Sequence, residues 1–161
     1  MSKIIGITGW KDVGKTHYAS LIIKSLVKKG YQVGSIKHAH HDFDIDKPGT
    51  DSFKHREAGS SQAIISSAKR WAKITENNNE NEKSLDELIQ EFHNVDIIVV
   101  EGFKKNNHPK IEILSKDLKN RNKEINNVIA IVSDSIKDTT IPVFKKNDIE
   151  SLVEFIIKNI L

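Results

Sequence analysis

Cysteine is missing from this 161-residue chain, and proline and methionine are scarce, with three residues and one. Without cysteine the protein forms no disulfide and offers no thiolate ligand to zinc, which agrees with a reducing compartment. The chain also lacks an apolar run of transmembrane length, and its first residues lack the long apolar core of a signal peptide. We therefore expect a cytoplasmic protein without a membrane partner.

A strong charge excess is lacking as well. Lys and Arg total 25 against 22 for Asp and Glu, so the formal net charge is +3. A dedicated nucleic-acid binder usually shows a stronger, clustered basic bias, so we expect no nucleic-acid partner. The shares of 37% hydrophobic and 29% charged residues are typical of a soluble globular protein. The length predicts one domain over residues 1–161.

Strand-like and helix-like segments alternate along the chain. The strand-like segments are residues 4–7, 31–38, 62–67, 70–75, 96–100, 110–114, 128–132 and 141–144. The helix-like segments are residues 15–29, a short segment capped by Thr50, residues 85–92 and residues 148–160. Because several strands are wholly apolar, the pattern predicts a three-layer α/β domain with a mostly parallel central sheet. Ligands of such sheets bind at the carboxyl ends of the strands.

The stretch GWKDVGKTHY, residues 9–18, lies where the first strand turns into the first helix. It matches G-x-x-x-x-G-K-[ST], the phosphate-binding P-loop pattern, in the required strand–loop–helix context. Glycines let main-chain N–H groups curl around anionic oxygens, and the helix N-terminus adds its positive dipole end. We assign Lys15 to the β- and γ-phosphates and Thr16 to Mg²⁺, and we expect the P-loop NTPase fold. The predicted nucleotide contacts are Gly9, Trp10, Lys11, Asp12, Val13, Gly14, Lys15, Thr16 and His17.

A carboxylate at the end of a second buried strand is the expected partner of this loop. The apolar run 96–100 ends at Glu101 and Gly102. P-loop proteins usually place such a carboxylate near Mg²⁺ and its waters, so we predict that Glu101 is a metal-side and catalytic group together with Lys15. Gly102 would permit close backbone approach to a γ-phosphate. A solvated carboxylate at a strand end is the alternative.

Residues 39–59 hold three of the seven histidines and many charged residues, and His38 comes directly before them. Three interpretations stay open: a polar loop, a metal site, and a switch-like loop over the nucleotide. The metal site would use His38, His40 and His41 with Asp42, Asp44 and Asp46. In the switch-like loop, Asp46 or Asp51 would meet Mg²⁺ through water, and Lys54 or Arg56 would meet anionic oxygens.

Ser133 and Asp134 follow another buried strand, at residues 128–132. An aspartate carboxylate can accept two hydrogen bonds from guanine N1 and N2, whereas adenine has no such pair of donors. We therefore predict that Asp134 contacts the base. The Asn-Lys that usually precedes such an aspartate is absent, so a plain loop aspartate is the alternative.

Three segments together resemble the MobB family, the P-loop proteins of molybdenum cofactor biosynthesis. They are GITGWKDVGKTHY, GSIKHAHHDFDIDKPGTDSFKHREAG and DIIVVEGFK, of which the second is the most specific. The resemblance implies a GTP-binding adaptor for molybdopterin-guanine dinucleotide biosynthesis, with weak GTPase activity, Mg²⁺ dependence and a homodimeric state. It also implies a partner, the MobA-type guanylyltransferase, which joins GMP to molybdopterin. By the same resemblance, Glu101 lies near the γ-phosphate and residues 46–56 approach the nucleotide or the cofactor.

Two rival functions fit the same fold. In a small-molecule kinase, residues 38–56 would bind the acceptor, and Asp42 or Asp46 would take its proton. In a metal-delivery GTPase, His38, His40 and His41 would hold nickel or zinc. Slow hydrolysis is expected of the isolated protein, because the sequence fixes no obvious arginine finger or glutamine in place. Arg56 is the candidate for such a finger.

Overall fold

Two units make up the chain in this computed structural model, which describes residues 3–39, 43–77, 82–114, 125–136 and 139–161. The sheet unit comprises Met1–His38 and Leu85–Leu161, and the hairpin unit comprises Ala39–Ser84. Each unit has its own sheet.

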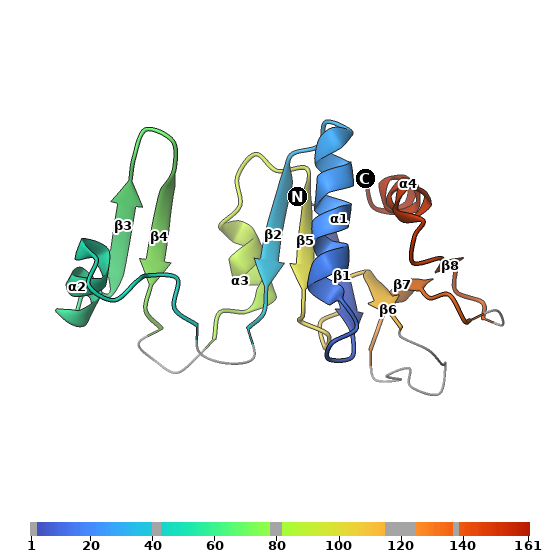
Figure 1. Ribbon diagram of the computed structural model, residues 1–161, viewed down its shortest axis with the longest axis horizontal. Helices are drawn as coiled ribbons and strands as arrows, with labels where there is room; N and C mark the ends of the chain where they lie inside the picture. The colour runs from blue at the N-terminus through green and yellow to red at the C-terminus, as the bar shows by residue number, and fades with distance from the viewer. Residues whose placement is uncertain (1–2, 40–42, 78–81, 115–124, 137–138) are drawn as a thin grey trace. The chain divides into compact units, whose positions relative to one another are not determined.

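The sheet unit is built on a six-stranded sheet in the order β2-β5-β1-β6-β7-β8, with every pairing parallel (Figure 1). Parallel pairing suits these segments, because strands buried on both faces read as continuous runs of Ile and Val. It also brings the carboxyl ends of all strands to one edge. The strands are β1 (Lys3–Gly9), β2 (Val33–Lys37), β5 (Ile97–Glu101), β6 (Lys110–Ile113), β7 (Val128–Val132) and β8 (Val143–Phe144).

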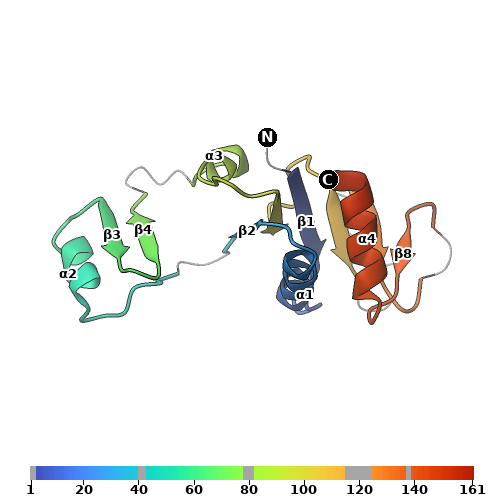
Figure 2. The same cartoon turned by 90° about the horizontal axis from the view of Figure 1, so that it is seen from above.

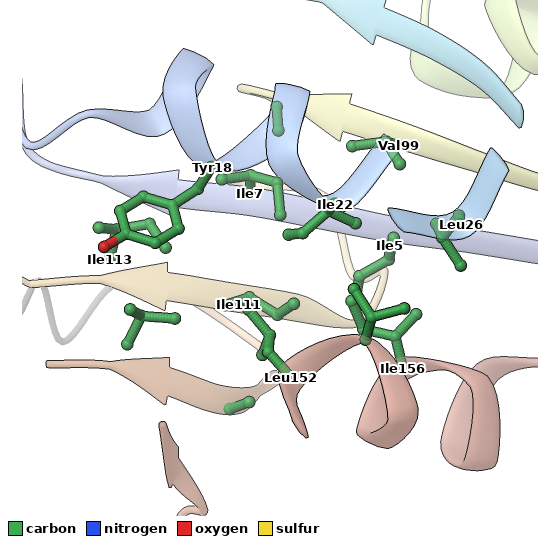
Figure 3. Packing of buried hydrophobic residues seen from close by; sticks show 14 of the residues in the cluster. Ile5, Ile7, Tyr18, Ile22, Leu26, Val99, Ile111, Ile113, Leu152 and Ile156 are labelled. Carbon is green, nitrogen blue, oxygen red and sulfur yellow. The ribbon is translucent and has the colours of Figure 1, made fainter. Parts of the chain in front are cut away.

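Helices cover both faces of this sheet. Helices α1 (Lys15–Lys28) and α4 (Ile149–Ile160) pack on one face, and α3 (Leu85–Gln90) packs on the other. Figure 2 shows α1 and α3 on opposite sides of the strands. The larger core joins Ile5 and Ile7 of β1 to Ile22 of α1 and Ile156 of α4, all fully buried (Figure 3). Each such side chain contributes roughly 1.5–3 kcal/mol of transfer free energy, so this core holds the P-loop segment in place.

The ends of the two long helices follow the expected capping rules. Gly30, directly after the end of α1, has a left-handed φ of +95°, as a glycine at this position commonly does. The Asp148 carboxylate caps α4 by accepting a hydrogen bond from the Ser151 N–H. Lys29 pairs with Glu150 and Glu154 of α4, which links the ends of the two helices.

The hairpin unit consists of the antiparallel strands β3 (Gln62–Ser66) and β4 (Trp71–Thr75) together with α2 (Asp51–Glu57). Thr50 caps α2, since its side-chain oxygen accepts a hydrogen bond from the Phe53 N–H. Both the hairpin and the capped helix confirm the sequence prediction.

Most predicted elements occur within a few residues of the expected bounds, and the three-layer α/β prediction is confirmed. The expected strand at 31–38 is shorter, because only Val33–Lys37 pairs with β5. Residues 115–124 lie outside the described residues. Among the described residues, no helix has both the length and the apolar character needed to cross a membrane.

One residue of the basic run 103–110 departs from the solvated surface that such runs usually form. Lys110 is fully buried, and its Nζ donates to the main-chain carbonyls of Asn106, His108 and Asn126. Burial lowers the pKa of this ammonium. Three carbonyl partners explain how the lysine is tolerated, because a buried charge needs a full set of hydrogen bonds.

His108 is buried beside this lysine and packs against the backbone of β1. A Cβ at Gly6 would lie 2.5 Å from its Nε2, so only glycine at position 6 leaves room for the ring. Neither ring nitrogen has a hydrogen-bond partner among the described residues. Burial, and then the charge of Lys110, lower the pKa of His108 to about 4.

His108 should therefore make the free energy of unfolding decrease as the pH falls from 7 to 5. Its pKa in the unfolded chain is about 6.5, so below that pH the unfolded state takes up a proton that the folded state refuses. From pH 7 to pH 5 this group should lower the free energy of unfolding by about 1–2 kcal/mol, with little further change below the folded pKa. Urea unfolding of the parent and of His108→Gln at both pH values measures the loss. An equal loss in both proteins would contradict the assignment.

Candidate nucleotide-binding site

The loop between β1 and α1 lies at the carboxyl edge of the sheet. The strand ends at Gly9 and the helix begins at Lys15, so all predicted contacts from Gly9 to His17 lie in one loop and the first turn of α1. Three loop residues have left-handed φ values: Gly9 at +145°, Asp12 at +63° and Gly14 at +89°. Such turns point successive N–H groups into one concave space, which together with the helix N-terminus favours an anion.

The two motif glycines serve different purposes. A Cβ on Gly9 would lie 2.5 Å from the carbonyl oxygen of Ile113 and 2.9 Å from Cγ2 of Val13. Gly9 therefore lets the loop leave the sheet against β6. A Cβ on Gly14 would meet nothing within 4 Å. The space beside Gly14 is open, and this is where the pattern predicts phosphate.

The Lys15 side chain folds back over the loop, where its Nζ donates to the Trp10 carbonyl at 2.7 Å. This bond places the ammonium above the N–H groups of the loop, the position from which a lysine can reach phosphate oxygens. Trp10 itself is 55% exposed, and the His17 ring contacts the edge of Tyr18 at 5.7 Å between centroids.

Thr16 and Glu101 meet directly, although 85 residues separate them in the chain. The Thr16 hydroxyl lies 2.8 Å from Oε1 and 3.0 Å from Oε2 of Glu101. Parallel pairing causes this, because β5 lies beside β1 with Ile7 opposite Glu101. A hydroxyl and a carboxylate are hard oxygen ligands, so this pair fits Mg²⁺. The roles predicted for Thr16 and Glu101 at Mg²⁺ stay predictions.

Sequence analysis missed a third member of this group, Lys37 at the end of β2. Its Nζ donates to Thr16 Oγ1 at 3.3 Å and lies 3.7 Å from Glu101 Oε1. Lys37 pairs in register with Glu101, so strand order brings it to the site. The sequence places Lys37 at the end of a predicted strand, but it does not say which strand lies beside that one.

Gly102 has a left-handed φ of +105°, and the group that its missing side chain admits is His38. A Cβ on Gly102 would lie 2.5 Å from the His38 Cβ. The His38 N–H also donates to the Glu101 carbonyl at 2.8 Å, and its ring stacks on Phe103 at 4.5 Å. The approach of Gly102 to a γ-phosphate stays a prediction.

The predicted histidine metal site lies largely outside the described residues, because His40, His41 and Asp42 fall in an undescribed gap. Within the described ranges no three His, Cys, Asp or Glu residues gather to hold a metal ion.

Asp134 lines a cavity of about 430 Å³ together with Lys145, Lys146 and Asn147. Its Oδ1 accepts the Lys146 N–H at 3.0 Å. The Tyr18 hydroxyl, two residues beyond Thr16, donates to the Lys146 carbonyl at 3.3 Å and so ties α1 to the same segment. Burial, and then the charge of Asp134, raise the pKa of Tyr18. The cavity thus opens beside the helix that starts at the P-loop.

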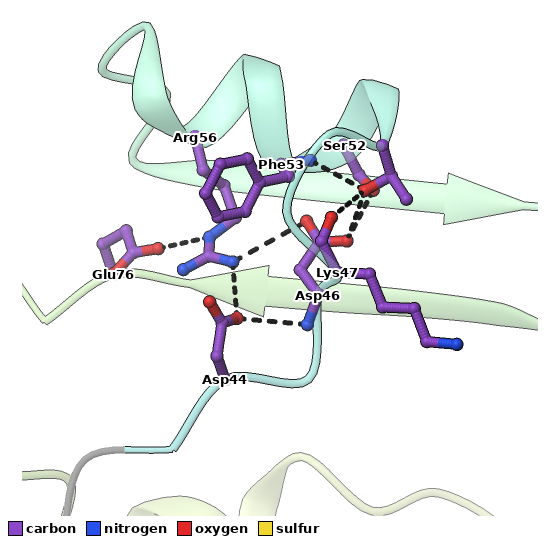
Figure 4. Close-up of polar contacts among 8 residues, drawn as sticks. Asp44, Asp46, Lys47, Ser52, Phe53, Arg56 and Glu76 are labelled. Carbon is purple, nitrogen blue, oxygen red and sulfur yellow. Dashed lines mark hydrogen bonds and ion pairs between the residues drawn. The ribbon is translucent and has the colours of Figure 1, made fainter.

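The other predicted site residues form a polar cluster inside the hairpin unit (Figure 4). Asp46 Oδ1 accepts hydrogen bonds from Ser52 at 2.8 Å and Thr50 at 3.1 Å. Arg56 pairs with three carboxylates, those of Asp44, Asp46 and Glu76, at 2.9, 3.7 and 2.6 Å.

These pairs explain the electrostatics of the cluster. The hydrogen bond from Arg56 lowers the pKa of Asp44. The hydrogen bonds that Arg56 donates, first to Glu76 and second to Asp44, raise the pKa of Arg56. Asp51 is exposed and pairs with Lys54 at 3.3 Å. Asp46 and Arg56 therefore hold the loop before α2 onto the hairpin. Contacts of Asp46, Asp51 or Arg56 with a nucleotide or Mg²⁺ stay predictions.

Comparison with known proteins identifies the family. The model described as "MobB: Molybdopterin guanine dinucleotide synthesis protein B" matches residues 4–134. The chain belongs to the MobB family. The molybdopterin-guanine dinucleotide biosynthesis adapter protein of Escherichia coli strain K12 is 36% identical, over 98% of this chain and 93% of its own. The Haemophilus influenzae protein of the same name is 38% identical, over 81% of this chain and 73% of its own.

Solved structures of MobB share this fold. A crystal structure of molybdopterin-guanine biosynthesis protein B aligns with a TM-score of 0.79 at 24% identity, over 96% of this chain and 97% of its own. A Bacillus subtilis MobB structure gives the same score at 23% identity, over 99% and 98%. The family member described here therefore has the P-loop NTPase fold that the sequence predicts.

The different environments of the motif glycines predict different costs for adding a methyl group. Gly14→Ala should lower the free energy of unfolding by about 1–2 kcal/mol, because only its left-handed backbone is strained. Gly30→Ala, at φ +95° and also in open space, is the matched control and should behave alike. Gly9→Ala should cost more than either, because its Cβ meets the Ile113 carbonyl. Urea unfolding measures all three, and equal costs would contradict the packing described for Gly9.

Proposed function

We propose that this adapter protein of molybdopterin-guanine dinucleotide biosynthesis binds GTP with Mg²⁺ through residues 9–16. The direct contact between Thr16 and Glu101 carries the proposal, because it joins a hydroxyl at the start of a P-loop helix to a carboxylate. Mg²⁺ in P-loop proteins is held by a serine or threonine of the loop and is served by a carboxylate at a strand end. Membership of the MobB family supports the same conclusion.

The side chains have distinct roles in this proposal. The N–H groups of residues 10–14 hold phosphate oxygens, and the Lys15 ammonium exchanges the Trp10 carbonyl for the β- and γ-phosphates. Thr16 and Glu101 hold Mg²⁺, which offsets the charge of the triphosphate. Glu101 also positions water for hydrolysis. Turnover should be slow, because the sequence fixes no arginine finger or glutamine in place, and an arginine finger accelerates such reactions by roughly 10³–10⁵.

The cavity at Asp134 is the proposed site of the base. Asp134 follows β7 at the carboxyl edge of the sheet, and β7 lies two strands away from β1. Neighbouring strands lie about 4.8 Å apart, so the distance of roughly 10 Å suits a nucleotide whose phosphates lie in the P-loop. Asp134 keeps Oδ2 for the ligand while Oδ1 accepts the Lys146 N–H. A carboxylate at this place favours guanine over adenine.

Assembly is the remaining part of the proposal: a homodimer that assists a MobA-type guanylyltransferase in the cytoplasm. The hairpin unit supports self-association, because Ile64 and Trp71 are 67% and 69% exposed. Among the described residues, the outer edges of β3 and β4 pair with no other strand. Open edges and exposed apolar side chains are features that proteins usually cover. The name of the Escherichia coli relative supports an adapter role within one pathway.

Removing the Lys15 ammonium tests the binding site. Lys15→Ala should weaken GTP binding by roughly ten- to a hundredfold, because charge-assisted hydrogen bonds to the phosphates are lost. Lys24→Ala, an exposed residue of the same helix, is the matched control and should bind as the parent does. Calorimetric titration with GTP, GDP and ATP, with and without Mg²⁺, gives the affinities.

The same titration repeated with the guanylyltransferase tests the adapter role. We expect GTP to be preferred over ATP and a complex with the partner to form. Undiminished GTP binding by Lys15→Ala would refute the proposed site. Preference for ATP with no complex would refute the proposed function.

Asp134 should decide which base is bound. Asp134→Asn replaces an acceptor with a donor next to guanine N2, so GTP affinity should fall roughly tenfold or more. Xanthosine triphosphate has a carbonyl at that position and should bind the variant better than the parent. Competition titrations with both nucleotides measure the switch. An unchanged ratio of the two affinities would place the base elsewhere.

A further inference from the structure

Lys37 is the charged side chain at the site that the proposed function does not use. It is the last residue of β2, and its Nζ lies within 3.7 Å of both Thr16 Oγ1 and Glu101 Oε1. The side chain is 62% exposed, whereas that of Glu101 is only 13% exposed. An exposed cation therefore lies beside the carboxylate that would face Mg²⁺.

The position of Lys37 is a consequence of strand order. In the order β2-β5-β1, Lys37 lies opposite Glu101, and Glu101 lies opposite Ile7. The Lys37 side chain reaches past β5 to the first turn of α1. The strand itself is anchored, since Ile36 is buried against β5 in the smaller core. Lys37 thus combines a main chain held in the sheet with an exposed side chain.

Mg²⁺ and the Lys37 ammonium compete for the same oxygens. The ammonium donates to the Thr16 hydroxyl, which is the atom that Mg²⁺ needs. Two cations around one oxygen repel each other strongly at such distances. When Mg²⁺ binds, the ammonium must leave Thr16, and its exposed stem allows this at small cost. The displaced ammonium would then be available to a terminal phosphate, which the P-loop pattern places at this same edge of the sheet.

We propose that Lys37 binds the γ-phosphate and so makes the site distinguish a nucleoside triphosphate from a diphosphate. This inference rests on the proposed function, in which the P-loop holds a Mg²⁺-bound nucleotide. With a diphosphate bound, Lys37 has no terminal phosphate to contact, and its exposed ammonium is left in water. Lys15 cannot supply the distinction alone, since the P-loop lysine reaches both the β- and γ-phosphates.

The test compares the affinities for a triphosphate and a diphosphate in the same variants. Lys37→Met keeps the length of the stem and removes the charge, Lys37→Arg keeps the charge, and Lys24→Met is the control on an exposed face of α1. Calorimetric titration in excess Mg²⁺ uses GDP and guanylyl imidodiphosphate, which resists hydrolysis. Lys37→Met should lose roughly ten- to a hundredfold in affinity for the triphosphate analogue and less than about threefold for GDP. Lys37→Arg should retain most of the preference, and Lys24→Met all of it.

Unchanged GDP binding also shows that Lys37→Met is folded. Equal losses for both nucleotides would overturn the inference, because Lys37 would then act through Thr16 or through the fold. No loss for either nucleotide would overturn it as well, while the proposed function would stand. If the parent binds neither nucleotide, the proposed function and this inference fail together.

Discussion

The hydrogen bond between Thr16 and Glu101 is the contact on which the site depends. It exists because β5 lies parallel to β1, with both strands ending at one edge. The P-loop supplies phosphate-binding N–H groups by itself, but a metal site needs an acid from elsewhere in the chain. Buried Ile and Val on both strands hold that acid in register. Core packing on the two faces thus sets the geometry of the chemistry at the edge.

The two lysine ammonium groups near this contact have partners within the chain. Lys15 is held by the Trp10 carbonyl, and Lys37 is held by Thr16 and Glu101. Both ammonium groups occupy positions from which a triphosphate and its metal would draw them away. In the proposed function the site would exchange these internal partners for ligand partners, which would keep the cost of desolvating charge small. A lysine buried elsewhere, Lys110, shows the contrast, because its carbonyl partners are built into the fold.

The hairpin unit is stabilised by different means. Among its described residues Ala63 is the one buried hydrophobic side chain. Arg56 bridges Asp44, Asp46 and Glu76, and the Thr50 and Ser52 hydroxyls donate to Asp46 Oδ1. Polar pairs of this kind impose a specific loop geometry more than they add stability. Its exposed apolar residues, Ile64 and Trp71 among them, are the features on which the proposed self-association rests.

The sequence by itself determined the local features. Apolar runs specified the strands, Thr50 and Asp148 specified helix starts, and the glycine–lysine–threonine spacing specified the P-loop, because each depends only on nearby residues. Tertiary structure decided which strands are neighbours, and therefore that Lys37 joins Thr16 and Glu101. It also decided that Lys110 and His108 are buried and that Asp46 and Arg56 bind each other. Strand order and long-range pairing depend on the packing of the whole sheet, which no local pattern encodes.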